Sequence, residues 1–238
     1  MERIDVSRHA ARPPLDRFVD RFWYASWALP EGAVVRPQIV GRPVVNLTFQ
    51  DGRATVTGVS RQLFRRELRG QGEVLGVVFR PACFHPFLDR PLHMIANRNV
   101  DCAELFGKAG ADWAQAVHEA PTVEAKLNEV HRFLVNRAPR ERTAGEALAD
   151  ALDALDDEQG LPSVRELRAS LGLGSRQLER LFRHYVGASP KWVVRRWHEY
   201  RIPPTPNPYA SPGAPVNVES PPQVPNGQSL NGGVITLG

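Results

Sequence analysis

Two short amphipathic segments joined by a glycine-bearing turn constrain the fold of this chain more than any other feature. They lie in residues 161–196, which read LPSVRELRASLGLGSRQLERLFRHYVGASPKWVVRR. Ser163 and Glu166 have the spacing of a capping box, which predicts the start of the first helix. The GLG triplet at 172–174 predicts the end of that helix, and Ser175 is the expected N-cap of the second helix.

Apolar residues recur at helical spacing on one side of each predicted helix, while the other side of the second helix is polar and basic. A pair of helices of this kind is the arrangement in which the second helix enters the major groove of DNA. A generic αα-hairpin with a solvated basic face is the alternative interpretation. The apolar stripes are Val164, Leu167 and Leu171 in the first helix, and Leu178, Leu181 and Phe182 in the second.

Charge is distributed unevenly along the chain. Residues 161–201 hold nine Lys or Arg and three Asp or Glu, whereas residues 1–160 hold 21 and 22. A near-neutral body with one compact basic segment favours nucleic-acid binding. From charge alone, a solvated helical face beside an acidic partner segment is an equally good interpretation.

Six polar residues are the candidates for contacts with DNA. Arginine pairs bidentately with guanine and glutamine with adenine, so we expect Arg176, Gln177 and Arg180 to read bases. A hydroxyl at a helix N-terminus suits a phosphate oxygen, which is the role expected for Ser175, and Arg183 is expected to contact phosphate as well. The predicted DNA-binding set is Ser175, Arg176, Gln177, Arg180, Arg183 and Lys191.

The run SRQLERLFRHYVGASPK at 175–191, with SVRELRASLGLG before it, resembles the first helix-turn-helix of the AraC/XylS family of bacterial transcription regulators. Upstream, PVVNLTFQDG, GVVFRPACFHPFL and DRFWYASW resemble the sensory domain that precedes this module in one branch of the family. The resemblance covers residues 13–201. It implies a β-rich, cupin-like sensor domain with helical dimerisation elements. It also implies a DNA-binding domain of two helix-turn-helix motifs bridged by a long linker helix.

The chain departs from the family pattern after the first motif. The linker helix would begin at Pro190 and run on into a second motif. Residues 202–238 instead hold nine prolines and one charged residue, Glu219. Because an interior proline costs a helix about 3 kcal/mol, no second pair of helices is predicted there. We expect residues 202–238 to be a disordered, Pro-rich tail.

Short strands joined by tight turns are predicted for the N-terminal part. Four of them favour an antiparallel sheet that curls into a sandwich or a barrel, with QDG at 50–52 as a hairpin signal. Helices that begin after Asp101 and Thr122, both good N-caps, are expected to follow the sheet. The predicted strands are 42–49, 53–60, 62–68 and 73–80.

The predicted fold class is α+β. It combines an N-terminal β-rich, cupin-like sensor domain with helices, a C-terminal all-α helix-turn-helix module and a disordered tail. One of the helices expected at 122–136 and 141–157 would form a dimer contact; the alternative is that each packs on its own domain. The predicted domains are the sensor domain at 1–121, a helical dimerisation or linker region at 122–160, the partial helix-turn-helix module at 161–201 and the tail at 202–238.

Other functional classes find little support in the sequence. The spacing of Cys83, His85, His93 and Cys102 matches no strong zinc pattern, so neither a metal nor another cofactor is expected. No G-x-S-x-G, P-loop or dinucleotide fingerprint stands in a suitable context, and we predict neither an enzyme nor catalytic residues. The aromatic residues of 15–28 are expected to belong to the core rather than to line a ligand pocket.

The cellular location is expected to be the cytoplasm. The chain has only two cysteines, which fits a reducing compartment. Its N-terminus shows no signal-peptide pattern, and no stretch approaches the roughly 18 apolar residues of a membrane span. We therefore expect a soluble protein without membrane contact.

Together these patterns predict a sequence-specific transcription regulator. A sensor domain would bind a small-molecule effector, and a homodimer would bind double-stranded DNA through the helix-turn-helix in the major groove. The alternative is a truncated ligand-binding or dimerising protein without DNA-binding activity of its own.

Overall fold

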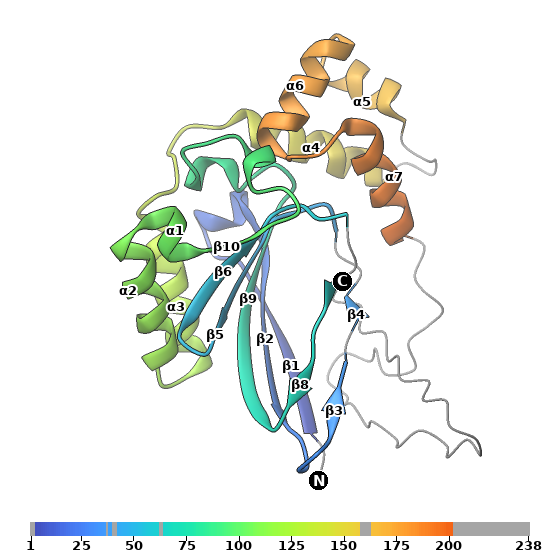
Figure 1. Cartoon of the computed structure of the whole chain (residues 1–238). Coiled ribbons are helices and arrows are strands. Elements are labelled where there is room, and N and C mark those ends of the chain that lie inside the picture. The colour runs from blue at the N-terminus through green and yellow to red at the C-terminus, as the bar shows by residue number, and fades with distance from the viewer. Residues whose placement is uncertain (1–2, 37, 40–41, 62–63, 158–162, 202–238) are drawn as a thin grey trace, which may run out of the picture.

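The computed structural model describes residues 3–36, 38–39, 42–61, 64–157 and 163–201. Within these residues it has the expected α+β fold, with an N-terminal antiparallel sheet of six strands followed by seven α-helices (Figure 1). The predicted tail and the predicted domain boundary at residue 160 lie outside the described residues.

The main sheet has the strand order β1–β2–β9–β5–β6–β10, and every neighbouring pair is antiparallel. The predicted strands at 42–49, 53–60 and 73–80 correspond to β5, β6 and β9, whereas β1, β2 and β10 had no counterpart among the predicted strands. The strands are β1 (Arg3–Ala10), β2 (Val19–Ala28), β5 (Asn46–Gln50), β6 (Arg53–Thr57), β9 (Gln71–Phe79) and β10 (Asn99–Asp101).

A two-residue turn sets the register of β5 and β6. Gln50 pairs with Arg53, and the two residues between them have positive φ, 51° at Asp51 and 72° at Gly52. A two-residue hairpin loop with both φ values positive matches the right-handed twist of the strands. The hairpin predicted at QDG is therefore confirmed.

Two short ribbons lie on the side of the main sheet opposite helices α1–α3 (Figure 1). The predicted strand at 62–68 is replaced by two separate two-residue segments that pair with different partners. The ribbons are β3 (Val34–Val35) with β8 (Leu68–Arg69), and β4 (Gln38–Ile39) with β7 (Phe64–Arg65).

Two tryptophans of β2 pack against glycines of β9. A Cβ added at Gly76 would lie 2.1 Å from the Trp23 indole, and one at Gly72 would lie 2.4 Å from the Trp27 indole. Trp27 is buried and Trp23 is half-buried. The expectation that these aromatics belong to the core is confirmed for Trp27.

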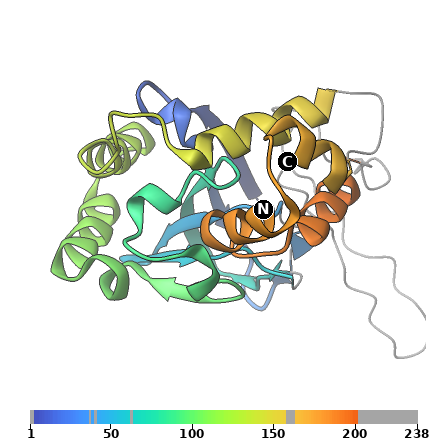
Figure 2. The same cartoon turned by 90° about the horizontal axis from the view of Figure 1, so that it is seen from above.

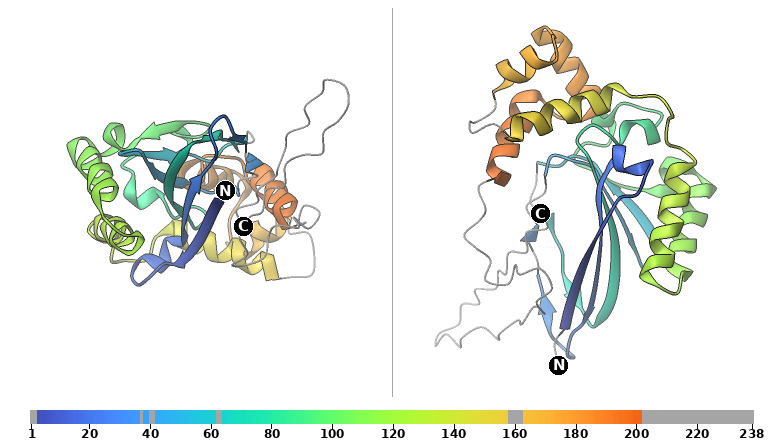
Figure 3. Two further views of the ribbon diagram at one scale, coloured as in Figure 1. Left: turned by 90° about the horizontal axis from the view of Figure 1, so that it is seen from below. Right: turned by 180° about the vertical axis from the view of Figure 1, so that it is seen from behind.

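Three helices cover one face of the sheet (Figures 1 and 3). Trp113 of α2 stacks on Phe133 of α3 with ring centroids 3.7 Å apart, and Val130 and Leu134 of α3 are buried in the same core as the sheet. Asp101 and Thr122 cap α1 and α3 as predicted. The helices are α1 (Cys102–Phe106), α2 (Lys108–Glu119) and α3 (Val123–Val135).

Four further helices lie across one end of the sheet (Figures 1 and 2). Leu148 and Leu152 of α4 belong to their core, and so do Val59 and Ala82 from the sheet part of the chain. The two helices of the predicted region 122–160 thus bury their apolar stripes in different cores. The helices are α4 (Ala144–Asp157), α5 (Val164–Ser170), α6 (Ser175–Tyr185) and α7 (Pro190–Arg201).

None of the helices in the described part of the chain has the length and apolar character needed to cross a membrane.

Candidate nucleic-acid interface

Helices α5 and α6 form the turn-linked pair expected from the sequence. Ser163 Oγ accepts the Glu166 N–H, and the Glu166 carboxylate accepts the Ser163 N–H, so the predicted capping box is present. Gly172 turns the chain with φ of 63°, a conformation that a glycine adopts without steric cost. The inner sides of the pair are buried at Leu167 and Phe182.

All six residues of the predicted DNA-binding set are exposed. Arg176 and Arg180 have no hydrogen-bond or ion-pair partner within the part of the chain that the structure describes. Helix α6 lies with α5 at the outer end of the molecule, away from the sheet (Figure 1). The pair can therefore offer free cationic side chains to a partner.

The predicted cap of α6 was wrong by one residue, because Gly174 is the N-cap and Ser175 is the first helical residue. Glycine has no side chain with which to cap, and Gln177 Oε1 accepts the Gly174 N–H at 2.8 Å instead. The Ser175 Oγ accepts a hydrogen bond from Arg168 Nη1 at 2.9 Å. Two of the predicted contact residues thus also organise the start of α6.

The C-terminal half of α6 contacts a loop of the sheet part that contains η2 (His85–Phe87) and η3 (Leu92–Met94). Arg183 Nη2 lies 3.3 Å from His93 Nε2. A Cβ on Gly187, just after the helix, would lie 2.9 Å from the Leu92 carbonyl oxygen, so the backbones approach closely. Arg183 is therefore less free than Arg176 and Arg180.

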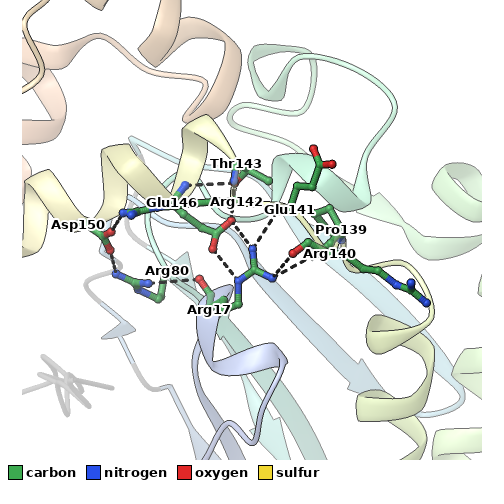
Figure 4. Close-up of polar contacts among 9 residues, drawn as sticks. All are labelled: Arg17, Arg80, Pro139, Arg140, Glu141, Arg142, Thr143, Glu146 and Asp150. Atoms are coloured by element: carbon green, nitrogen blue, oxygen red, sulfur yellow. Dashed lines mark hydrogen bonds and ion pairs between the residues drawn. The ribbon is translucent and has the colours of Figure 1, made fainter.

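A buried ion pair joins α4 to the sheet part (Figure 4). Arg17 Nε donates to Glu146 Oε1 at 2.8 Å, and Arg17 Nη2 donates to Glu146 Oε2 at 3.1 Å. The same guanidinium donates to the carbonyls of Pro139, Arg140 and Glu141. Arg17 thus fixes both the start of α4 and the segment that leads into it.

Glu146 completes a capping box at the start of α4. Its carboxylate accepts the Thr143 N–H at 2.8 Å, and Thr143 Oγ1 accepts the Glu146 N–H at 3.3 Å. Burial acts to raise the pKa of Glu146, but the hydrogen bonds from Arg17 and Thr143 outweigh it and hold that pKa below its usual range. The side chain is 7% exposed, so the ionised form depends on these partners.

Arg80 makes a second bridge from the sheet to α4. Its Nη2 donates to Asp150 Oδ1 at 2.8 Å and to Asp153 Oδ2 at 2.7 Å, and its Nη1 donates to the Arg17 carbonyl at 3.3 Å. Arg142 also pairs with Asp150 (Figure 4). The two bridges position α4, and with it the core on which α5 and α6 pack.

Helix α7 is attached to the sheet part by an aromatic contact. Trp197 is 4% exposed and packs with Val44 and Val78 beside Trp23. The Arg42 guanidinium lies 5.1 Å from the centre of the Trp197 ring, a cation–π geometry. This contact forms an apolar cluster separate from the core of the C-terminal helices.

The residues considered for a metal do not form a common site. Within the described residues, no group of three or more His, Cys, Asp or Glu side chains is placed to hold a metal ion. Cys83 and Cys102 are buried thiols, and burial raises the pKa of each to about 12. His85 contacts α6 instead, with its ring centroid 4.3 Å from that of His184.

A polar cluster between the sheet and α3 surrounds a cavity of about 20 Å³, which has room for a single water. Tyr24 Oη donates to Glu73 at 2.6 Å, and burial with this carboxylate raises the pKa of Tyr24 to about 12. Lys126 donates to Glu73 and to the carbonyls of Val117 and His118. These hydrogen bonds pair the polar groups of Tyr24, Glu73 and Lys126 with one another and with α2, and they hold α2 and α3 against the sheet.

The sequence reasoning missed the residues that position the helix pair. Arg17 and Glu146 are 129 positions apart, so no local pattern links them. A partial signal existed, since Thr143 and Glu146 have capping-box spacing. No comparable signal marked His93 or Trp197.

One family model matches part of the chain. It is described as a domain of unknown function (DUF6597) and covers residues 7–101. That range begins within β1 and ends with the last residue of β10, so it contains most of the sheet and none of the seven α-helices. No curated protein and no solved structure matches the chain.

Proposed function

We propose that this chain is a transcription regulator that binds double-stranded DNA in the major groove through α6. The observation that carries the proposal is the outer side of α6, where Arg176, Gln177 and Arg180 are exposed on the second helix of a turn-linked pair. The resemblance of residues 175–191 to the first helix-turn-helix of AraC/XylS regulators supports the same assignment.

The sheet part would act as a cupin-like sensor for a small-molecule effector. Its antiparallel sheet, with helices on one side and ribbons on the other, supports this role. The Arg17, Arg80 and Trp197 contacts would transmit a change in the sheet to α4 and α7.

The proposed homodimer would not use the apolar stripes of the two helices considered for it. Val130 of α3 and Leu148 of α4 are fully buried inside the chain's own cores. A dimer contact on α3 or α4 would therefore involve their outer, polar faces.

Binding of the full chain to duplexes selected from a randomised pool, followed by fluorescence anisotropy, tests the proposal. Arg180→Ala should relax specificity at one base pair by about 1–3 kcal/mol. Arg183→Ala should weaken all sequences alike, because a phosphate contact carries no sequence information. Arg132→Ala, an exposed arginine on α3, is the matched control and should change neither property. Identical effects of the Arg180 and Arg183 variants would overturn the assignment.

Salt dependence separates the proposal from its alternative. The logarithm of the binding constant should fall linearly with the logarithm of salt, with a slope of about −0.9 for each phosphate that a Lys or Arg side chain neutralises. The alternative is a ligand-binding or dimerising protein without DNA-binding activity, favoured by the lack of a second predicted helix pair after Arg201. Absence of binding to any selected duplex at low salt would establish that alternative.

A further inference from the structure

The C-terminal half of α6 is held to the sheet part by two contacts that each involve a histidine of the loop containing η2 and η3. The His85 ring lies 4.3 Å from the His184 ring and 4.6 Å from the Tyr185 ring. Arg183 Nη2 lies 3.3 Å from His93 Nε2. All three α6 residues are consecutive, so both contacts act on the same turn of the helix.

The Arg183 contact joins α6 to η3. A guanidinium has only donors, so His93 Nε2 is the acceptor in this contact. Arg183 thus links α6 to the same loop as His184 and Tyr185 do.

The His85 contact favours a neutral ring. Burial and the neighbouring His184 lower the pKa of His85. Its two ring neighbours on α6, His184 and Tyr185, carry no negative charge near neutral pH. Protonation of His85 is therefore opposed where α6 packs on the loop.

We propose that acidification releases the C-terminal half of α6 from this loop, through protonation of His85 where its ring packs on His184 and Tyr185. A base that is kept neutral in the packed state contributes stability above its free pKa of about 6.5, and this contribution is lost as the pH falls below that value. The closed contact at Gly187 would open with it, since the Leu92 carbonyl lies on the same loop. The contact between α6 and this loop would open in acid whether or not α6 binds DNA.

Hydrogen exchange of the full chain, read by mass spectrometry and corrected for the intrinsic pH dependence of exchange, tests the proposal. In the wild-type protein, amides of residues 181–186 should lose protection several-fold between pH 8 and pH 5, while those of β9 do not change. In the variant His85→Gln this pH-dependent loss should disappear. His9→Gln is the matched control, because His9 lies on β1 and contacts Ser7. The control should behave as the wild type.

Two outcomes would overturn the proposal. One is unchanged protection of residues 181–186 at pH 5 in the wild type, and the other is an equal loss in the His85→Gln variant. If that variant fails to fold, a titration of the His85 ring signals of the wild type by NMR decides instead. His85 should titrate below about pH 6.5, the value of a free histidine, and a midpoint at or above it would contradict the proposal.

Discussion

Arg17 shows how much one side chain can determine in this molecule. Its guanidinium donates to both oxygens of Glu146 and to three successive backbone carbonyls before α4. The geometry is bidentate, the strongest form of an arginine–carboxylate pair.

Arg17→Ala should lower the free energy of unfolding by about 2–3 kcal/mol, because it leaves the buried Glu146 carboxylate without its cation. Urea unfolding at neutral pH measures this. The control Arg132→Ala removes an exposed pair with Glu129 and should change stability by less than about 0.5 kcal/mol. Equal effects of the two variants would show that the Arg17 pair contributes no more than a surface pair.

Glu146 should also leave a signature in the pH dependence of stability. Because its folded pKa is depressed, its contribution is present above the unfolded value of about 4.3 and is lost as the pH falls through the folded value. Glu146→Gln should remove this part of the acid dependence. Urea midpoints at pH 7 and pH 3 measure it: the variant should lose less stability between these pH values than the wild type. A steeper acid loss in the variant would contradict the sign.

At the scale of elements, Gly145 decides how closely α4 approaches the sheet. A Cβ at this position would lie 2.4 Å from the Ala82 carbonyl oxygen, which is backbone and cannot turn aside. Alanine normally stabilises a helix by up to about 1 kcal/mol relative to glycine. Here the steric clash should reverse the sign of that effect.

Gly145→Ala is therefore expected to destabilise the chain by about 1–2 kcal/mol, as overpacking does elsewhere. Ala154→Gly, at an exposed position of the same helix, reports propensity alone and should cost about 1 kcal/mol. Thermal and urea unfolding of both variants provide the comparison. A stabilised Gly145→Ala variant would mean that α4 can move away from the sheet at no cost.

The elements that the sequence predicted are those with a local chemical signal. Asp101, Thr122 and Ser163 cap helices as expected, and Asp51 with Gly52 forms the expected hairpin. Strand β1 escaped prediction because it is an edge strand with mostly exposed residues, which removes the alternation of buried and exposed positions. Helix α2 has an amphipathic face, but glycine at its N-cap provides no capping signal.

The candidate site likewise has one part that the sequence predicted and another that it did not. The exposed side of α6 follows from the spacing of Leu178 and Phe182, which fixes the inner side of one helix. The surroundings of α6 do not follow, because Arg183 meets His93 across 90 positions and Glu146 meets Arg17 across 129. Such pairs depend on how two folded parts approach each other, and charge complementarity alone does not select one pair among many.

At the scale of the whole molecule, several contacts join the C-terminal helices to the sheet part. Val59 and Ala82 complete the helical core, two arginines reach α4, and Trp197 of α7 packs on Val44. These shared contacts predict that the two parts unfold together. Calorimetry of the wild type should show a single transition.

Trp197→Ala should separate that transition into two. Removing a buried indole costs about 3 kcal/mol, and here the loss falls on a cluster that links α7 to the sheet. The C-terminal helices should melt first, with β2 and β9 keeping their amide protection. Trp192→Ala, at a half-buried residue beside Arg61, should shift the melting temperature less and keep one transition. A single transition in the Trp197 variant would show that the remaining contacts suffice.

The two sheet-part residues in the helical core also imply an order of assembly. Val59 and Ala82 leave the ribosome before any residue of α4–α7, and N-terminal parts of a chain generally fold first during synthesis. The sheet can then serve as a template on which the later helices bury Leu148, Leu167 and Phe182. Helices made without that template would keep part of their apolar surface in water. The nascent C-terminal segment thus depends on its own N-terminal half much as a client depends on a chaperone.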